Sequence, residues 1–159
     1  MNSALKTIRY RGGLVDAEFP ANWKEEYEAE GGGTFYEDKP DSGTLRLNVL
    51  SFASKEARLP SDVVREVFGA EGYETLPSGF SMRHLVKTAE ERGTQLHLHR
   101  WEVLVPVTSI HTRLVCFTHT LLAAHEGTNR AKEELRIVDA IIRTARFSTA
   151  PGELQKKPW

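Results

Sequence analysis

The runs TQLHLHRWEVLV (residues 94–105) and IHTRLVCFTHTLL (residues 110–122) decide the fold of this 159-residue chain. Both contain many β-branched and aromatic residues, and both are longer than the usual strand of about five or six residues. Pro106 and the short segment 107–109 separate them, which favours a turn. We therefore expect a long antiparallel hairpin at the centre of a sheet.

Shorter extended runs surround this hairpin. In the clearest of them Leu45, Leu47 and Val49 alternate with Arg46 and Asn48, which is typical of a strand with one buried face and one solvent-exposed face. Short turns join the early runs, so we predict an antiparallel meander there, with a turn at 20–23 that buries Trp23. The runs lie at residues 7–10, 14–19, 23–30, 34–37, 44–52 and 81–88.

Two segments have helical spacing instead. After Pro60, apolar residues at 63, 64, 67 and 68 predict a short helix that ends near Gly69, with Ser61 or Asp62 as its cap. A longer series of apolar residues at helical spacing predicts a second helix, which starts near Thr128 or Asn129 and packs on the sheet. Its residues are Ala131, Leu135, Val138, Ile142 and Ala145, and residues 145–148 are expected to leave it as an edge strand. The expected class is α+β: about six or seven antiparallel strands, a short early helix and a long C-terminal helix.

The composition of the chain limits the classes of function that we expect. A hydrophobic fraction of 40% and a charged fraction of 27% are ordinary for one globular domain, which we place at residues 1–148, with residues 149–159 as a flexible tail. The net charge of -1 disfavours nucleic-acid and membrane partners. Cys116 is the only cysteine, so no internal disulfide forms. Without a signal-peptide core in the first ten residues, we expect the cytoplasm.

Several short motifs resemble the PsbP-like superfamily. They are FPANW (19–23), GGTFY (32–36) and GTLRL (43–47), followed by RWE (100–102) and the closing helix with Phe147. The resemblance covers about residues 7–148. It implies a PsbP-like α/β/α sandwich that binds other proteins and has no shared catalytic centre. Some members of this superfamily bind Ran, and some bacterial relatives act as adaptors or chaperones, so an adaptor-like role is the expectation.

The histidines of the long hairpin raise a metal hypothesis. His97 and His99 share one face of their strand, and His119 on the next strand is a candidate third ligand. If Val105 pairs with Ile110, Glu102 faces Arg113 and His119 lies on the opposite face from His97 and His99. If Val105 pairs with His111 instead, His97 lies beside His119 and the three can converge. Both registers stay open, and we expect no metal or other cofactor, with these histidines as the fallback site.

Cys116 is the only candidate nucleophile. In the first of the two registers it faces His99, which could serve as its base. Its neighbours in the run LVCF (114–117) are apolar, so a buried structural thiol is the simpler interpretation and we assign no catalytic residue.

Three carboxylates alternate along the run 23–30, at Glu26, Glu28 and Glu30. We interpret them as the charged protection of an edge strand. The chain has no GxSxG, HExxH or paired CxxC motif. The sequence therefore predicts a non-enzymatic protein-binding domain, with self-association of its sheet as a further possibility. The alternative is a small-molecule or metal-binding domain whose site, on the 94–122 hairpin, uses His97, His99 and Trp101 with Cys116 or His119.

Overall fold

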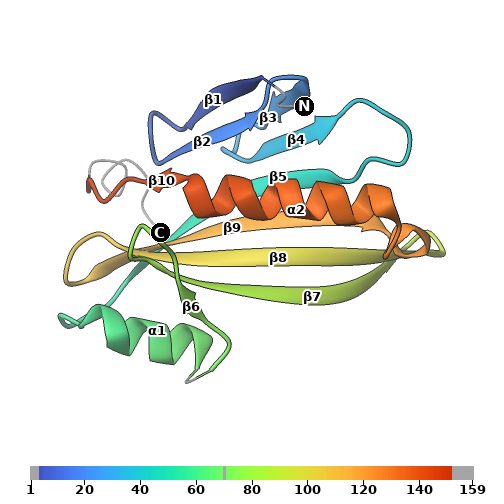
Figure 1. Ribbon diagram of the computed structural model, residues 1–159. Helices are drawn as coiled ribbons and strands as arrows, with labels where there is room; N and C mark the ends of the chain where they lie inside the picture. Colours follow the sequence, from blue (N-terminus) through green and yellow to red (C-terminus); the bar gives the residue numbers. More distant parts are fainter. Residues whose placement is uncertain (1–3, 70, 152–159) are drawn as a thin grey trace.

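The computed structural model describes residues 4–69 and 71–151. They form two antiparallel sheets, one of three strands in the order β1-β2-β10 and one of seven in the order β3-β4-β5-β9-β8-β7-β6 (Figure 1). The strands are β1 (Leu5–Tyr10), β2 (Val15–Pro20), β3 (Trp23–Tyr27), β4 (Gly33–Glu37), β5 (Thr44–Ala53), β6 (Glu74–Thr75), β7 (Ser81–Glu91), β8 (Thr94–Pro106), β9 (His111–Leu122) and β10 (Arg146–Phe147). The helices are α1 (Pro60–Phe68), the 3-10 turn η1 (Ala123–His125) and α2 (Asn129–Thr144).

The two helices lie on opposite faces of the seven-stranded sheet. Odd-numbered residues of β8 and β9, such as Trp101 and Phe117, pack in the same cluster as Val138 and Ile142 of α2. Even-numbered residues, such as Leu104 and Leu114, pack with Val64 and Phe68 of α1. We call these two faces the α2 face and the α1 face. The sandwich of helix, sheet and helix confirms the predicted α+β class.

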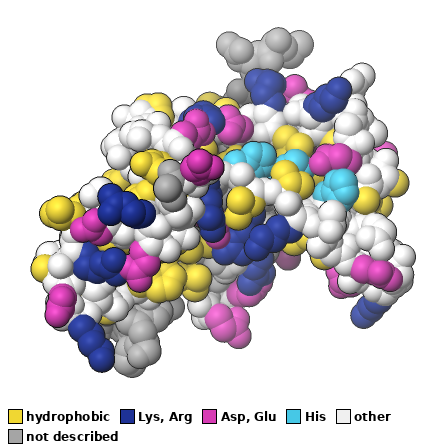
Figure 2. Space-filling model, turned by 90° about the horizontal axis from the view of Figure 1, so that it is seen from below, with side chains coloured by type: hydrophobic (Ala, Val, Ile, Leu, Met, Phe, Trp, Pro, Cys, Tyr) yellow, Lys and Arg dark blue, Asp and Glu magenta, His cyan; other side chains and the backbone are white. Residues whose placement is uncertain are grey.

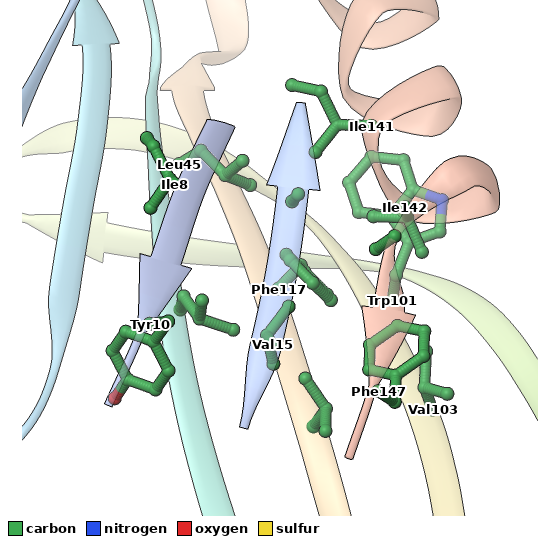
Figure 3. Close-up of a cluster of buried hydrophobic side chains, with 14 of the residues drawn as sticks. Ile8, Tyr10, Val15, Leu45, Trp101, Val103, Phe117, Ile141, Ile142 and Phe147 are labelled. Carbon is green, nitrogen blue, oxygen red and sulfur yellow. The ribbon is translucent and has the colours of Figure 1, made fainter. Parts of the chain in front are cut away.

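The main core lies between the α2 face and the small sheet. Ile8, Tyr10 and Val15 of the small sheet point toward Leu45 and Phe117 of the large sheet (Figure 3). Phe19 and Phe35 join the two sheets with ring centroids 4.6 Å apart. By contrast, α1 covers only one end of the α1 face, and no other helix of residues 4–69 and 71–151 covers the rest (Figure 1).

The meander predicted for residues 7–52 is interrupted. β2 pairs with β1 and β10, whereas β3 begins the larger sheet, so Pro20 to Asn22 lead the chain from one sheet to the other. Trp23, just after this corner, is buried as expected. The predicted edge strand after α2 is confirmed by the pairing of Phe147 with Val15.

The predicted helices are confirmed, with one correction at a cap. Thr128 caps α2 by accepting a hydrogen bond from the backbone of Ala131. In α1, neither Ser61 nor Asp62 is the cap, because the helix begins at Pro60, whose fixed φ suits the first helical position. No helix in residues 4–69 and 71–151 is long and apolar enough to cross a membrane. Most of the tail expected at 149–159 lies outside the described residues.

Candidate functional site

The register of the central hairpin differs from both expected alternatives. Val105 lies opposite Arg113, and His99 lies opposite His119. The strands separate earlier than predicted because the hydroxyl of Thr108 accepts hydrogen bonds from the backbone of Ile110 and His111, which places Ile110 in the turn.

The expected pair of Glu102 and Arg113 is therefore wrong. Arg113 lies on the α2 face and donates to the backbone carbonyls of Ser148 and Ala150. Glu102 lies on the α1 face and accepts from Arg83 at 2.7 Å and from Arg100 at 2.8 Å. Arg113 and Glu102 thus each have hydrogen-bonding partners, but they do not pair with each other.

The three candidate histidines share the α2 face but belong to two networks. His119 is 1% exposed, and its Nε2 lies 2.7 Å from Oε1 of Glu134 in α2. The same carboxylate oxygen accepts the backbone N–H of Gly43 at 2.7 Å. His97 and His99 both contact Glu126 instead. In the described part of the chain, no group of three or more His, Cys, Asp or Glu side chains is arranged to hold a metal ion.

The second network forms a directed chain of hydrogen bonds at the margin of the sheet. His84 Nε2 lies 3.2 Å from His99 Nδ1, and His99 Nε2 lies 2.9 Å from Glu126 Oε1. An ionised carboxylate only accepts, so His99 donates from Nε2, its Nδ1 accepts, and His84 donates from Nε2. In the tautomer of His99 that carries its proton on Nε2, the hydrogen bonds run from His84 through His99 to Glu126.

Aromatic packing and the local charges fix the same network. His84 stacks on Trp101 with ring centroids 4.4 Å apart. Burial lowers the pKa of His84, and the adjacent His99 lowers it further. Partial burial alone would raise the pKa of Glu126, but the hydrogen bonds from His99 and His97 hold it below its usual value. The network therefore favours an ionised Glu126.

Cys116 does not face His99, which corrects the nucleophile hypothesis. It lies on the α1 face opposite Glu102, and the guanidinium of Arg100 donates to its sulfur at 3.2 Å. Burial raises the pKa of the Cys116 thiol, although Arg100 opposes this effect. Cys116 is buried, as its apolar neighbours indicated, and Arg100 is the partner that its sulfur has among the described residues.

The margin beyond the histidines is an open strand edge. β6 pairs only with Ser81 and Met82, so no described strand lies along the outer side of β7 from Arg83 to Glu91. Backbone groups on such an edge lack strand partners and can bind another extended segment. Val86 on this stretch is 54% exposed, which is unusual for a β-branched apolar residue on a charged edge.

Side chains flank this edge on both faces. Arg83, Leu85 and Lys87 lie on the α1 face, whereas His84 and Val86 lie on the α2 face. Figure 2 shows Lys and Arg side chains in the middle of the molecule and histidines gathered beside them. Lys87 has no ion pair within the described residues, so its charge is available to an incoming strand. We call residues 83–91 the β7 edge.

Two carboxylates at the opposite edge of the same sheet have partners within the chain. Of the three predicted carboxylates only Glu26 lies within β3, and it accepts a hydrogen bond from Tyr36 at 2.5 Å. Glu28 lies beyond the strand and forms an ion pair with Arg46. Only one of the three predicted carboxylates therefore lies on the β3 edge, and it accepts a hydrogen bond from the same chain.

A groove of about 710 Å³ lies between α2 and the corner where the two sheets meet. Trp23, Ile137 and Ile141 are among its apolar residues. Its charged residues pair with one another or with neighbours, as Glu133 does with Arg136 and Glu37 with Arg130. Few polar groups are left to orient a small ligand, so the groove does not favour a small-molecule site.

Sequence reasoning missed His84 and Glu134. His84 lies in a run already predicted as a strand, but its contact with His99 depends on strand pairing that composition does not encode. Glu134 was detectable in principle, since it follows Ala131 by three residues and precedes Val138 by four, within the buried stripe of α2.

Comparisons with known proteins support the fold alone. No family model matches the chain, and no curated protein matches its sequence. Three solved structures share its architecture. A Bacteroides thetaiotaomicron protein is 17% identical over 93% of this chain, with a TM-score of 0.59. LpqN of Mycobacterium tuberculosis, described as involved in cell envelope biogenesis, is 13% identical with a TM-score of 0.61. A Mog1 mutant is 12% identical with a TM-score of 0.53.

The extent of these matches differs. The chain covers 91% of LpqN and 96% of the Mog1 mutant, but it spans about half of the Bacteroides protein, or 49%. The Mog1 likeness confirms the PsbP-like fold expected from the short motifs of the sequence.

Proposed function

We propose that this chain is a non-enzymatic protein-binding domain that holds an extended segment of its partner along the β7 edge. One observation carries the proposal: no strand in the described part of the chain pairs with the outer side of nine consecutive residues of the eleven-residue β7. Addition of a strand to such an edge is a common mode of peptide recognition, in which backbone hydrogen bonds supply affinity and flanking side chains supply specificity.

The flanking side chains support a partner strand that carries acidic and apolar residues. Lys87 offers an unpaired positive charge on the α1 face, and Leu85 lies two residues before it. Val86 offers an apolar contact on the α2 face. The near-neutral net charge favours protein over nucleic acid or membrane as the partner. The PsbP-like fold, whose resemblance implies partner binding, supports the same conclusion.

Proline substitution on β7 tests the assignment. Successive N–H groups of a strand point in opposite directions, so one of Val86→Pro and Lys87→Pro removes an outward N–H and leaves the pairing with β8 intact. The variant that retains its thermal transition is the probe. The matched control is the equivalent pair on the opposite edge, Glu25→Pro and Glu26→Pro.

Each protein is used to capture partners from its own host extract, followed by quantitative mass spectrometry. The expected result is a protein that wild type and the β3 control enrich and that the folded β7 variant loses. Retention of the same protein by the folded β7 variant would contradict the assignment. His97→Ala combined with His99→Ala separates the alternative, because a ligand or metal site on the hairpin would then lose its uptake while partner capture persists.

The domain extent and the compartment are part of this proposal. Residues 1–148 are treated as one domain, since β10 near the end of this stretch pairs with β2 near its start. The cytoplasm is the proposed compartment, because the single, unpaired Cys116 suits a reducing environment. Cell fractionation with an antibody to the chain tests the compartment, and recovery in the envelope fraction would contradict it.

A further inference from the structure

The open stretch of β7 has an internal symmetry. It runs from Arg83, next to the last residue covered by β6, to Glu91, where the strand ends before the turn at Arg92 and Gly93. Its middle residue is Lys87. When a second copy of this stretch is placed antiparallel to it with the two Lys87 residues opposite each other, all nine residues of each copy have a partner.

We infer that two copies of this chain pair antiparallel along the β7 edge, on a two-fold axis through Lys87, to form one continuous sheet. The inference rests on the proposed function, because it names a second copy of this chain as a partner of the same edge. A two-fold axis perpendicular to the sheet must pass between one residue and the same residue of the second copy. Moving the axis to the next residue therefore shifts the second strand by two residues along the first.

Only one of these registers fills the whole open stretch. With Lys87 on the axis, residues 83–91 of each copy lie opposite residues 91–83 of the other. With Val86 on the axis, Glu90 and Glu91 of the second copy would lie where β6 already pairs with Met82 and Ser81. With Thr88 on the axis, Arg83 and His84 would face the turn of the second copy and gain no strand partner.

Charges are complementary in the same register. Arg83 lies opposite Glu91 of the second copy, and His84 lies opposite Glu90 of the second copy. The two-fold axis repeats both pairs, so four cross-strand pairs join opposite or hydrogen-bonding groups. Between them, Val86 lies opposite Thr88 and Leu85 lies opposite Ala89, which are small or apolar contacts suited to a sheet.

Lys87 is the one unfavourable position. On the axis its ammonium group faces an identical group, and like charges directly opposite each other destabilise a strand pair. An edge contact of one strand also lies at the small end of stable interfaces. The dimer is therefore expected to be reversible, so a partner strand can displace one copy from the edge.

Disulfide trapping in the full chain tests the register. Directly opposite residues have Cα atoms about 4.5–5.5 Å apart, which a disulfide can bridge. Lys87→Cys is expected to form a covalent dimer under mild oxidation. Glu90→Cys is the matched control on the same edge, because its copies lie six residues apart along the strands, about 20 Å. Cys116 is buried and does not compete.

Sedimentation across a range of concentrations gives the second readout. Lys87→Thr removes the like-charge pair and is expected to lower the dimer dissociation constant roughly two- to five-fold. Glu90→Lys combined with Glu91→Lys places positive charge opposite Arg83 and His84 and is expected to weaken the dimer. Glu30→Lys with Glu56→Lys changes the net charge equally, away from β7, and is expected to leave the dimer unchanged.

The outcomes separate the two proposals. A chain that is monomeric throughout, or one that cross-links no better at position 87 than at position 90, overturns self-pairing. If such a monomer still loses its partner with the β7 proline variant, the proposed function stands. If the dimer locked at position 87 binds the partner protein as tightly as the free chain does, the partner does not use the β7 edge.

Discussion

Replacement of Gly43 by alanine is a sharp test of how α2 is fixed to the sheet. A Cβ at this position would lie 2.5 Å from Cε1 and 2.7 Å from Nε2 of His119, and 2.7 Å from the backbone oxygen of Thr120. Gly43 does not adopt a positive φ, so alanine suits its backbone conformation in this respect and the penalty comes from contact. The backbone N–H of Gly43 would also move away from Glu134.

Two terms set the size of the effect. Overpacking of a rigid core costs about 1–3 kcal/mol, and loss of a hydrogen bond to a charged acceptor costs about 1.5–3 kcal/mol. We therefore expect Gly43→Ala to reduce the free energy of unfolding by about 3–5 kcal/mol. For a domain of this size that corresponds to a fall in Tm on the order of 10 °C.

Urea and thermal unfolding followed by circular dichroism measure this change. The control is Gly72→Ala, since Gly72 has a φ of 90° but nothing within 4 Å of an added Cβ. That variant carries only the backbone penalty of about 1–2 kcal/mol. If Gly43→Ala is no more destabilising than Gly72→Ala, the network of Gly43, Glu134 and His119 does not hold α2 as described.

Two further predictions concern pH and the thiol. Because burial and His99 lower the pKa of His84, the unfolded state binds more protons, so stability is complete above the unfolded value of about 6.5 and falls as the pH drops below it. The urea concentration at the unfolding midpoint should fall more between pH 7.5 and 5.5 for wild type than for His84→Gln. This variant removes the titrating imidazole and retains the nearby charges of Asp139 and Glu74. Equal falls in the two proteins would contradict the prediction. Because burial raises the pKa of Cys116, its thiol should react with a thiol reagent at pH 7.5 only as fast as the chain unfolds. Rapid stoichiometric labelling of the folded protein would show that the sulfur is accessible.

The sequence predicted the elements well because their periodicity is local. The stripe from Ala131 to Ile142 places one side of α2 against the sheet whatever the pairing of the strands. The alternation of Leu45, Leu47 and Val49 likewise assigns one face of β5 to the core. Local patterns of this kind were sufficient for the α+β class, whereas the PsbP-like fold was implied by the resemblance of short motifs to that superfamily.

The register between β8 and β9 was harder to predict because it depends on the length of the turn that joins them. The hydroxyl of Thr108 accepts hydrogen bonds from the backbone of Ile110 and His111 in a longer turn, and Val105 lies opposite Arg113 instead of Ile110 or His111. The candidate site followed the register: His99 lies opposite His119, but each binds a different glutamate. Neither glutamate belongs to the hairpin, so no reading of residues 94–122 alone could identify these partners.

The last strand has a consequence for the order in which the protein can mature during synthesis. β10 supplies the third strand of the small sheet through Arg146 and Phe147, opposite Asp16 and Val15 near the start of the chain. α2, made just before β10, supplies Val138 and Ile142 to the main core. A chain emerging from the ribosome therefore has its strands ready long before the segments that cover them. Until α2 and β10 have been synthesised, the part of the α2 face that they cover stays exposed to solvent.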